Sequence, residues 1–142
     1  MSAAATNPWT IESAAAALRD GTTTSEALVR SMFDAADSLD DTLGVYLARF
    51  DQQALDAARR ADAELAAGAD RGPLHGIPLA VKDIICTKTM PTTCGSPIYR
   101  DFVAGRDAAC VTQLVKAGAI VLGKSVTTEF AGAHAGKTHN PH

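Results

Sequence analysis

The sequence predicts an α/β protein in which N-terminal helices precede a partial, mostly parallel sheet with crossover helices. Four helical segments and three short apolar runs alternate in the order α-α-β-α-β-α-β, which is typical of layered folds with parallel strands. Of the 142 residues, 46% are hydrophobic but only 5% are aromatic, so alanine, leucine and valine supply most of the apolar content. This composition favours closely packed helices around a modest sheet.

The first two helices are predicted from their ends and their apolar stripes. The first runs from about Thr10, its N-cap, to Arg19, and Gly21 stops it. The second begins near Thr23, because Thr23 and Glu26 have the spacing of a capping box. The apolar residues that recur at helical intervals are Ile11, Ala14, Ala15 and Leu18 in the first segment and Leu28, Met32, Ala35 and Leu39 in the second.

The third and fourth helices show the same periodicity. The third extends from about Asp51 to Ala67, and the fourth begins at Asp107 as its cap and ends at Gly118. Their packed residues are expected to be Ala54, Ala58, Ala61 and Leu65 in the third helix, and Val111, Leu114 and Val115 in the fourth.

Three short apolar runs are predicted to be strands: Val45 to Leu47, Ile77 to Val81, and Ala119 to Leu122. The last two should lie in one sheet, with the fourth helix as a right-handed crossover between them. Pro78 lacks the amide that a central strand needs, so it should lie at a strand start or on an edge. The irregular stretch from Cys86 to Arg106 has the length of a functional loop.

The composition argues against nucleic-acid and membrane partners. The net charge is −3, and no basic block accompanies it. No apolar run approaches the length of a membrane span, and the N-terminus lacks the positive region of a secretion signal. Cys86, Cys94 and Cys110 are odd in number and irregular in spacing, which fits reduced thiols better than a disulfide framework. We therefore expect a cytoplasmic protein.

Residues 118–125 match the phosphate-binding pattern G-x-x-x-x-G-K-S/T. Such a loop follows a strand, precedes a helix and needs flexible backbone in between. Here a helix precedes Gly118, and the four central residues, Ala-Ile-Val-Leu, favour a buried strand. The strand is the preferred interpretation, and nucleotide binding is the alternative.

The histidines do not predict a metal site. His134, His139 and His142 lie close together in a loop-like stretch, but no carboxylate or cysteine lies beside them in the sequence. Ordinary loop histidines are preferred over a zinc site. His75 is interpreted as a polar turn residue, and neither a metal nor a cofactor is predicted.

Lys82 follows the apolar run that ends at Val81, so it should emerge at the carboxyl end of a strand, where α/β proteins bind ligands. A lysine there can act as a base if desolvation lowers its pKa, or as a cation for an anionic substrate. The position also fits an ordinary surface charge, and the neighbouring Asp83 favours the ammonium form. The residues by themselves leave these alternatives open.

Residues 72–83 read GPLHGIPLAVKD, and this stretch resembles a motif of the amidase-signature family. The agreement continues in order at Thr92-Thr93-Cys94-Gly95-Ser96, Asp107, Leu114, Ala117-Gly118-Ala119, Gly123-Lys124-Ser125, Glu129-Phe130-Ala131 and Asn140-Pro141. It is strong over residues 43–142, whereas the two N-terminal helices match only in kind. The resemblance implies a truncated piece of the amidase-signature fold. Residues 1–142 would be the N-terminal part of one domain, with a helical segment at 1–42 and an α/β portion at 43–142.

The resemblance also implies an activity. In that family a carboxamide is hydrolysed through a Ser–cis-Ser–Lys triad, in which the lysine deprotonates a bridging serine that activates the nucleophilic serine. By resemblance that lysine is Lys82, in a site dry enough to lower its pKa. Both serines lie beyond the family's Asn-Pro, here Asn140-Pro141, so the chain alone is expected to be inactive. Ser96 and Ser125 lie in family turns, and neither has a bridging role in the pattern.

The leading hypothesis is therefore the N-terminal part of an amidase that acts on a small amide. The second is a non-catalytic remnant that binds a partner through an uncovered sheet edge, and the third is a nucleotide-binding protein. Exposed core surface should make the chain self-associate or only marginally stable. A thiol nucleophile at Cys86 or Cys94 is disfavoured, since no histidine is placed beside them. The identity of the amide, and the choice between a free-standing amidase and part of an amidotransferase, stay open.

Overall fold

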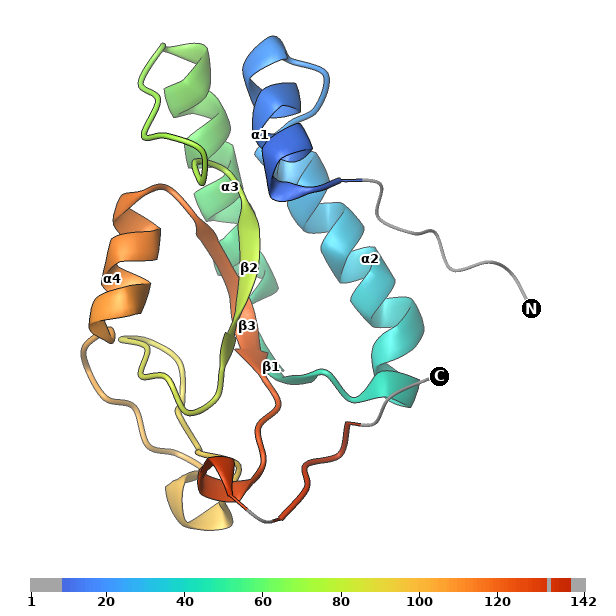
Figure 1. Ribbon diagram of the computed structural model, residues 1–142, viewed down its shortest axis with the longest axis vertical. Coiled ribbons are helices and arrows are strands. Elements are labelled where there is room, and N and C mark those ends of the chain that lie inside the picture. The colour runs from blue at the N-terminus through green and yellow to red at the C-terminus, as the bar shows by residue number, and fades with distance from the viewer. Residues whose placement is uncertain (1–8, 133, 139–142) are drawn as a thin grey trace.

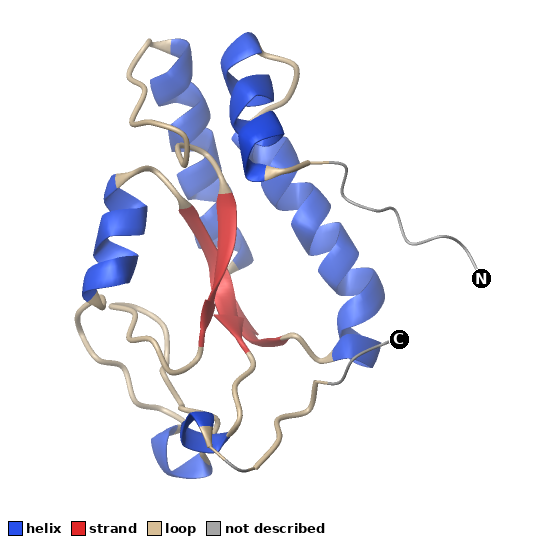
Figure 2. Ribbon diagram, in the orientation of Figure 1, coloured by secondary structure: helices blue, strands red, loops and turns tan. Residues whose placement is uncertain are grey.

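The computed structural model describes residues 9–132 and 134–138. Its regular elements follow the order that the sequence predicts (Figure 1). The helices are α1 (Ile11–Asp20), α2 (Ser25–Leu43), α3 (Asp51–Ala66) and α4 (Ala109–Lys116), and the strands are β1 (Tyr46–Arg49), β2 (Pro78–Lys82) and β3 (Ile120–Ser125). The short 3-10 helices η1 (Pro97–Tyr99) and η2 (Glu129–Ala131) lie in the connections. Figure 2 colours helices, strands and loops separately.

The three strands have the order β1-β3-β2. β2 and β3 pair in parallel, from Pro78 opposite Ile120 to Lys82 opposite Ser125, which confirms that the two predicted runs share a sheet. β1 pairs with β3 in the antiparallel direction, so the sheet is mixed. The direction of β1 is not encoded locally, because this strand pairs with one that is distant in the sequence. The handedness of the connection through α4 stays a prediction.

Pro78 and Gly123 occupy positions that suit their backbones. Pro78 is the first residue of β2, which is an edge strand, and this confirms the expectation for the proline. Gly123 lies where the backbone of β1 approaches β3 closely, since a Cβ built there would be 2.2 Å from the carbonyl oxygen of Ala48 and 3.0 Å from Cα of Arg49. β1 can therefore pair at this register only because residue 123 has no side chain.

The main hydrophobic core lies between α2, α3 and β3. Its buried members are Val29 and Phe33 from α2, Ala54, Ala58 and Ala61 from α3, and Ile120 and Leu122 from β3. A second cluster joins α1 and α2 to the residue before β2, and consists of Ala14, Ala15, Leu18, Leu28 and Ile77. In Figure 1, α1 and α2 stand on one side of the sheet and α4 on the other. Within the described residues, no helix combines the length and the apolar character that a membrane crossing needs.

The helix caps agree with the sequence for α1 but not for α2. Thr10 caps α1 and forms a capping box with Ser13, and Gly21 ends the helix in a left-handed conformation. The N-cap of α2 is Thr24, one residue later than predicted. The box between Thr23 and Glu26 is wrong, because the carboxylate of Glu26 instead accepts hydrogen bonds from two arginines, one on α2 and one on α3.

The start of α4 also corrects a prediction. Its N-cap is Ala108, which has no capping side chain. Asp107, the predicted cap, instead accepts a hydrogen bond from the amide of Lys88 at 2.6 Å, so its carboxylate ties the connection after β2 to the start of the helix. Val111 is buried as expected, whereas Val115 is 43% exposed, because the covered face of this 8-residue helix is narrower than its apolar stripe.

Candidate functional site

Lys82 is the last residue of β2 and lies at the carboxyl end of the parallel pair, where the sequence places it. Its side chain is exposed and makes no hydrogen bond or ion pair with the part of the chain that the structure describes. The next residue, Asp83, continues the pairing, since its amide donates to the carbonyl of Ser125 at 3.0 Å. The position of Lys82 is thus set by its backbone, while its amine has no partner in the described part of the chain.

Next to Lys82 lies a buried ion pair that sequence reasoning missed. Lys124, in the central strand β3, and Asp83 are each 1% exposed, and Nζ of Lys124 lies 3.4 Å from Oδ1 of Asp83. The ammonium also donates to the carbonyl of Ile85 at 2.7 Å and to Oγ1 of Thr92 at 2.8 Å. An ammonium has three N–H bonds, so these three contacts match its donors in number.

Thr93 supplies the remaining contacts of Asp83. Its amide donates to both carboxylate oxygens, at 3.2 and 3.1 Å, and its hydroxyl donates to Oδ2. Burial lowers the pKa of Lys124 from its ordinary value, and the negative charge of Asp83 opposes this shift. The sequence does hold a signal for this pair. Asp83 ends the motif AVKD, Lys124 follows the glycine of GKS, and both motifs lie at the ends of adjacent strands.

Beyond the ends of β2 and β3, three residues with strained backbone lie where the loop after β2 meets the segment after β3. Cys94, Phe130 and Ala131 have φ angles of 53°, 49° and 57°, although none is a glycine. The amide of Phe130 donates to the carbonyl of Cys94 at 2.8 Å, and the amide of Cys94 donates to the carbonyl of Asp83 at 3.0 Å. Each left-handed residue of this kind costs on the order of 1 kcal/mol, and such strain clusters at functional sites. The junction is therefore linked by hydrogen bonds to the residue after Lys82.

An exposed aromatic patch, defined as Tyr99, Phe102 and Phe130, occupies the same end of the molecule. The ring of Tyr99 lies 5.8 Å from that of Phe102 and 5.9 Å from that of Phe130, in edge-to-face geometry. The three residues are 41%, 46% and 54% exposed, and the neighbouring Ile98 is 82% exposed. Tyr99 belongs to η1 and Phe130 to η2, and in Figure 1 these two short helices lie below the strands, coloured gold and red. Exposed apolar clusters of this kind mark contact surfaces.

Most residues of the phosphate-binding pattern form a strand, as predicted. Six residues of the pattern, Ile120 to Ser125, form β3, which pairs with β1 and β2 on its two sides. The amine of Lys124 is taken by buried acceptors, and no α-helix follows Ser125 within the described residues. Backbone amides that pair within a sheet cannot turn toward phosphate.

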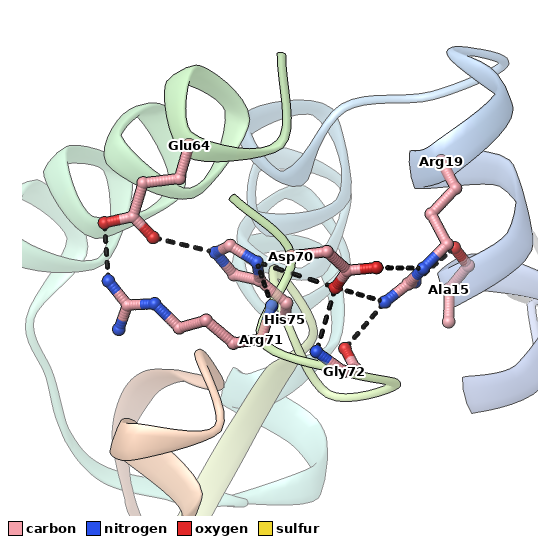
Figure 3. A network of polar contacts seen from close by, with 7 residues as sticks. All are labelled: Ala15, Arg19, Glu64, Asp70, Arg71, Gly72 and His75. Carbon is pink, nitrogen blue, oxygen red and sulfur yellow. Dashed lines mark hydrogen bonds and ion pairs between the residues drawn. The ribbon is translucent and has the colours of Figure 1, made fainter. Parts of the chain in front are cut away.

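His75 lies in the turn before β2, as predicted, but it is buried, which the sequence did not indicate. It is 1% exposed and belongs to the polar network of Figure 3. Its Nδ1 accepts a hydrogen bond from the amide of Arg71 at 3.2 Å, and its Nε2 lies 3.0 Å from a carboxylate oxygen of Glu64. The ring fits because Gly118 packs against it, where a Cβ would approach Cδ2 of the ring to 2.5 Å.

The rest of this network joins α1 and α3 to the turn before β2 (Figure 3). Arg19 donates to the two carboxylate oxygens of Asp70 at 2.8 and 2.7 Å, and to the carbonyl of Gly72 at 2.7 Å. The amide of Gly72 and the guanidinium of Arg19 together lower the pKa of Asp70. Glu64 also pairs with Arg71 at 2.5 Å. The network anchors the amino end of β2, opposite the end that carries the candidate base.

The other histidines and the thiols form no metal site in residues 9–132 and 134–138, where no group of three potential ligands is arranged to hold an ion. His134 is exposed and lies 3.5 Å from Glu129. His139 and His142 lie outside the described residues. Cys86 and Cys94 are half-buried and Cys110 is exposed, and all three thiols are unpaired.

The family is decided by similarity over most of the chain. The family model named Amidase matches residues 27–142. The chain belongs to the amidase family. It is 41% identical over 114 residues to a glutamyl-tRNA(Gln) amidotransferase subunit of Natranaerobius thermophilus, a match that covers 80% of this chain and 23% of the relative. The same subunit of Coxiella burnetii is 44% identical over 114 residues, with the same coverage.

A solved structure of an amidase shares the fold of this chain. The native peptide amidase of Stenotrophomonas maltophilia superimposes with a TM-score of 0.83 and 34% identity, over 87% of this chain and 26% of that one. The four helices and the mixed sheet thus correspond to part of the amidase-signature fold. The chain spans about a quarter of the length of the relatives it matches.

Proposed function

We propose that this chain is the N-terminal part of an amidase that hydrolyses the C–N bond of a carboxamide, with Lys82 as the terminal base of a Ser–cis-Ser–Lys triad. The position of Lys82 carries the proposal. In a chain that belongs to the amidase family, this lysine is the second-to-last residue of the stretch that resembles the family motif. At the carboxyl end of β2 its amine has no partner among the described residues. The two serines, and most of the oxyanion hole, would come from a segment that follows residue 142.

The chemistry requires a relay of protons. A serine hydroxyl is a poor nucleophile until a base takes its proton. Neutral Lys82 would deprotonate the bridging serine, which would deprotonate the nucleophilic serine as its oxygen attacks the carboxamide carbon. The proton then passes to the leaving nitrogen, the C–N bond breaks, and an acyl-serine ester remains. Water hydrolyses this ester to the carboxylate and frees the serine.

Lys82 can serve as the base only where desolvation favours its neutral form. In the described structure its side chain is exposed, so nothing removes it from water. The segment that carries the serines would also have to cover Lys82. We therefore propose that the chain by itself lacks amidase activity, because it has neither the nucleophile nor the dry site.

The relatives support amide chemistry without choosing the substrate. One group is named for an amidotransferase, and another is named as a peptide amidase. We propose a small carboxamide as the substrate, no metal or cofactor, and a cytoplasmic setting, which the unpaired thiols support.

A hybrid enzyme tests this function. Residues 1–142 replace the matching segment of the Stenotrophomonas maltophilia peptide amidase, and ammonia release from a peptide amide is measured. The hybrid should be active, and Lys82→Met should reduce its kcat by about 10⁴-fold. Lys88→Met, which removes an exposed lysine from the same connection, is the matched control and should retain activity. Full activity of the Lys82→Met hybrid would contradict the proposed role of Lys82.

A second candidate function, a non-catalytic binding module, is favoured by one observation. The exposed aromatic patch lies beside a sheet whose outer strands, β1 and β2, have unpaired edges within the described residues. Such a module should bind the separately produced remainder of the peptide amidase without restoring turnover. Turnover in that mixture, lost with Lys82→Met, would favour the amidase instead.

A further inference from the structure

We propose that Lys124 is a positioning residue: through its contacts with the segment from Asp83 to Thr92, it holds the backbone that follows Lys82 and so sets where the amine of Lys82 can reach. This inference rests on the proposed function, in which Lys82 is the base. It gives Lys124 no contact with the substrate.

The burial of Lys124 needs an explanation. Its side chain is among the largest that are fully buried in the described residues, although it carries an amine. Removing an ammonium from water costs several kcal/mol unless acceptors replace the lost water. Lys124 recovers this cost through Ile85, Thr92 and Asp83.

All these acceptors belong to one segment. Ile85 and Thr92 accept hydrogen bonds from Nζ, and Asp83 contributes the opposite charge. The donor, in contrast, projects from the central strand of the sheet. Because three contacts from a rigid strand converge on a single loop, the loop is located in three dimensions relative to β3.

The peptide next to Lys82 begins this segment and is held at both of its backbone polar groups. The amide of Asp83 donates to Ser125 and its carbonyl accepts from Cys94, both at 3.0 Å. Its carboxylate is held by Thr93 as well as by Lys124. Lys82 has no side-chain partner among the described residues, so the fold positions it through its own backbone in β2 and through the backbone of Asp83 that follows.

Stability alone does not require this arrangement. Replacing a buried ion pair by apolar or neutral groups of similar shape is often neutral or even stabilising. What apolar packing cannot supply is direction, because hydrogen bonds to a charged group prescribe the positions of their acceptors. We therefore assign the pair to fixing the position of the loop after β2, more than to stabilising the fold.

The first experiment uses the 142-residue chain. The double variant Lys124→Met with Asp83→Asn removes both charges at nearly constant shape, so no charge is left buried alone. NMR hydrogen exchange should show the amides of residues 83 and 94 exchanging about tenfold faster or more, while the amide of Ile120, which donates to Ile77, stays protected. Thr92→Val, which removes a single acceptor, should give a smaller increase, and Lys88→Met should give none.

Unchanged exchange at residues 83 and 94 in the double variant would overturn the proposal, whether or not the chain is part of an enzyme. Thr92→Val decides the same question if the double variant does not fold. If the amides of residues 83 and 94 exchange as slowly in Thr92→Val as in the parent chain, Lys124 does not hold this backbone.

The second experiment uses the hybrid amidase. In the double variant Lys124→Met with Asp83→Asn, displacement of Lys82 should lower kcat by about 10²-fold and leave KM within about threefold. A misplacement of about 1 Å near the reacting atoms reduces the rate by about this factor. An unchanged kcat in the double variant, in a hybrid that Lys82→Met inactivates, overturns positioning by Lys124. Full activity of Lys82→Met instead refutes the proposed function, and the exchange data still decide whether Lys124 holds the backbone.

Discussion

Replacing Gly123 by alanine should separate β1 from the sheet. The added Cβ would lie 2.2 Å from the carbonyl oxygen of Ala48, 3.2 Å from its carbonyl carbon and 3.0 Å from Cα of Arg49. These are backbone atoms, so no side-chain rotation can relieve the overlap. Ordinary contacts begin near 3.4 Å, so β1 must move away from residue 123 by more than 1 Å. Residue 123 pairs directly with Arg49, so this movement disrupts the pairing of β1 with β3.

The expected cost follows from two contributions. Overpacking of a tight site costs about 1–3 kcal/mol. Weakening the adjacent backbone hydrogen bonds adds about 1 kcal/mol for each bond lost. A total of about 3 kcal/mol is a large share of the stability of a small domain, which is about 5–15 kcal/mol. At about 3 °C per kcal/mol, the midpoint of thermal unfolding should fall by about 10 °C.

Urea and thermal unfolding, followed by circular dichroism, measure this cost. Gly21→Ala is the matched control, because Gly21 has φ of 77° and no atom within 4 Å of its Cβ position, so that variant reports backbone strain alone. It should cost about 1 kcal/mol. Equal or smaller destabilisation by Gly123→Ala would refute the argument that the close approach of β1 requires a glycine.

Three further outcomes are expected. Burial lowers the pKa of Lys124 below 10.5, so the unfolded chain binds more protons between the lowered value and 10.5, and the free energy of unfolding should rise with pH in that window. Urea unfolding at neutral and alkaline pH should show this rise in the parent but not in Lys124→Met with Asp83→Asn. The chain should bind no ATP in equilibrium dialysis, and saturable binding that Lys124→Met abolishes would contradict the strand assignment. Sedimentation should show that the chain self-associates and that the double variant Tyr99→Ser with Phe130→Asn associates less. Unchanged association of this double variant would exclude the aromatic patch as the contact surface.

Features with a local cause could be predicted from the sequence. Thr10 begins α1 and Gly21 ends it where expected, because a capping side chain and a left-handed glycine bind or shape only the adjacent helical turn. Pro78 begins an edge strand because its missing amide limits where it can lie. Lys82 lies at the end of β2 because it directly follows the apolar run, while its role as a base stays a prediction.

Local patterns were wrong where a distant partner competed for the same group. Glu26 has the spacing of a capping box but pairs with Arg30 and Arg59, and the latter belongs to another helix. Asp107 precedes a helix but binds the amide of Lys88, which comes from the connection after β2. In the folded chain, Arg59 and the amide of Lys88 bring donors to these two carboxylates from other segments, which local spacing does not show.

The sequence by itself determined the order of the elements, the family and the place of Lys82, since each depends on residues that are neighbours along the chain. Only the tertiary structure decided the antiparallel direction of β1 and the burial of His75 and Lys124. The polar partners of His75 come from α3 and the turn before β2, and those of Lys124 from the loop after β2. A histidine or a lysine becomes a core residue only when folding brings enough partners to replace its water, and no local pattern records that assembly.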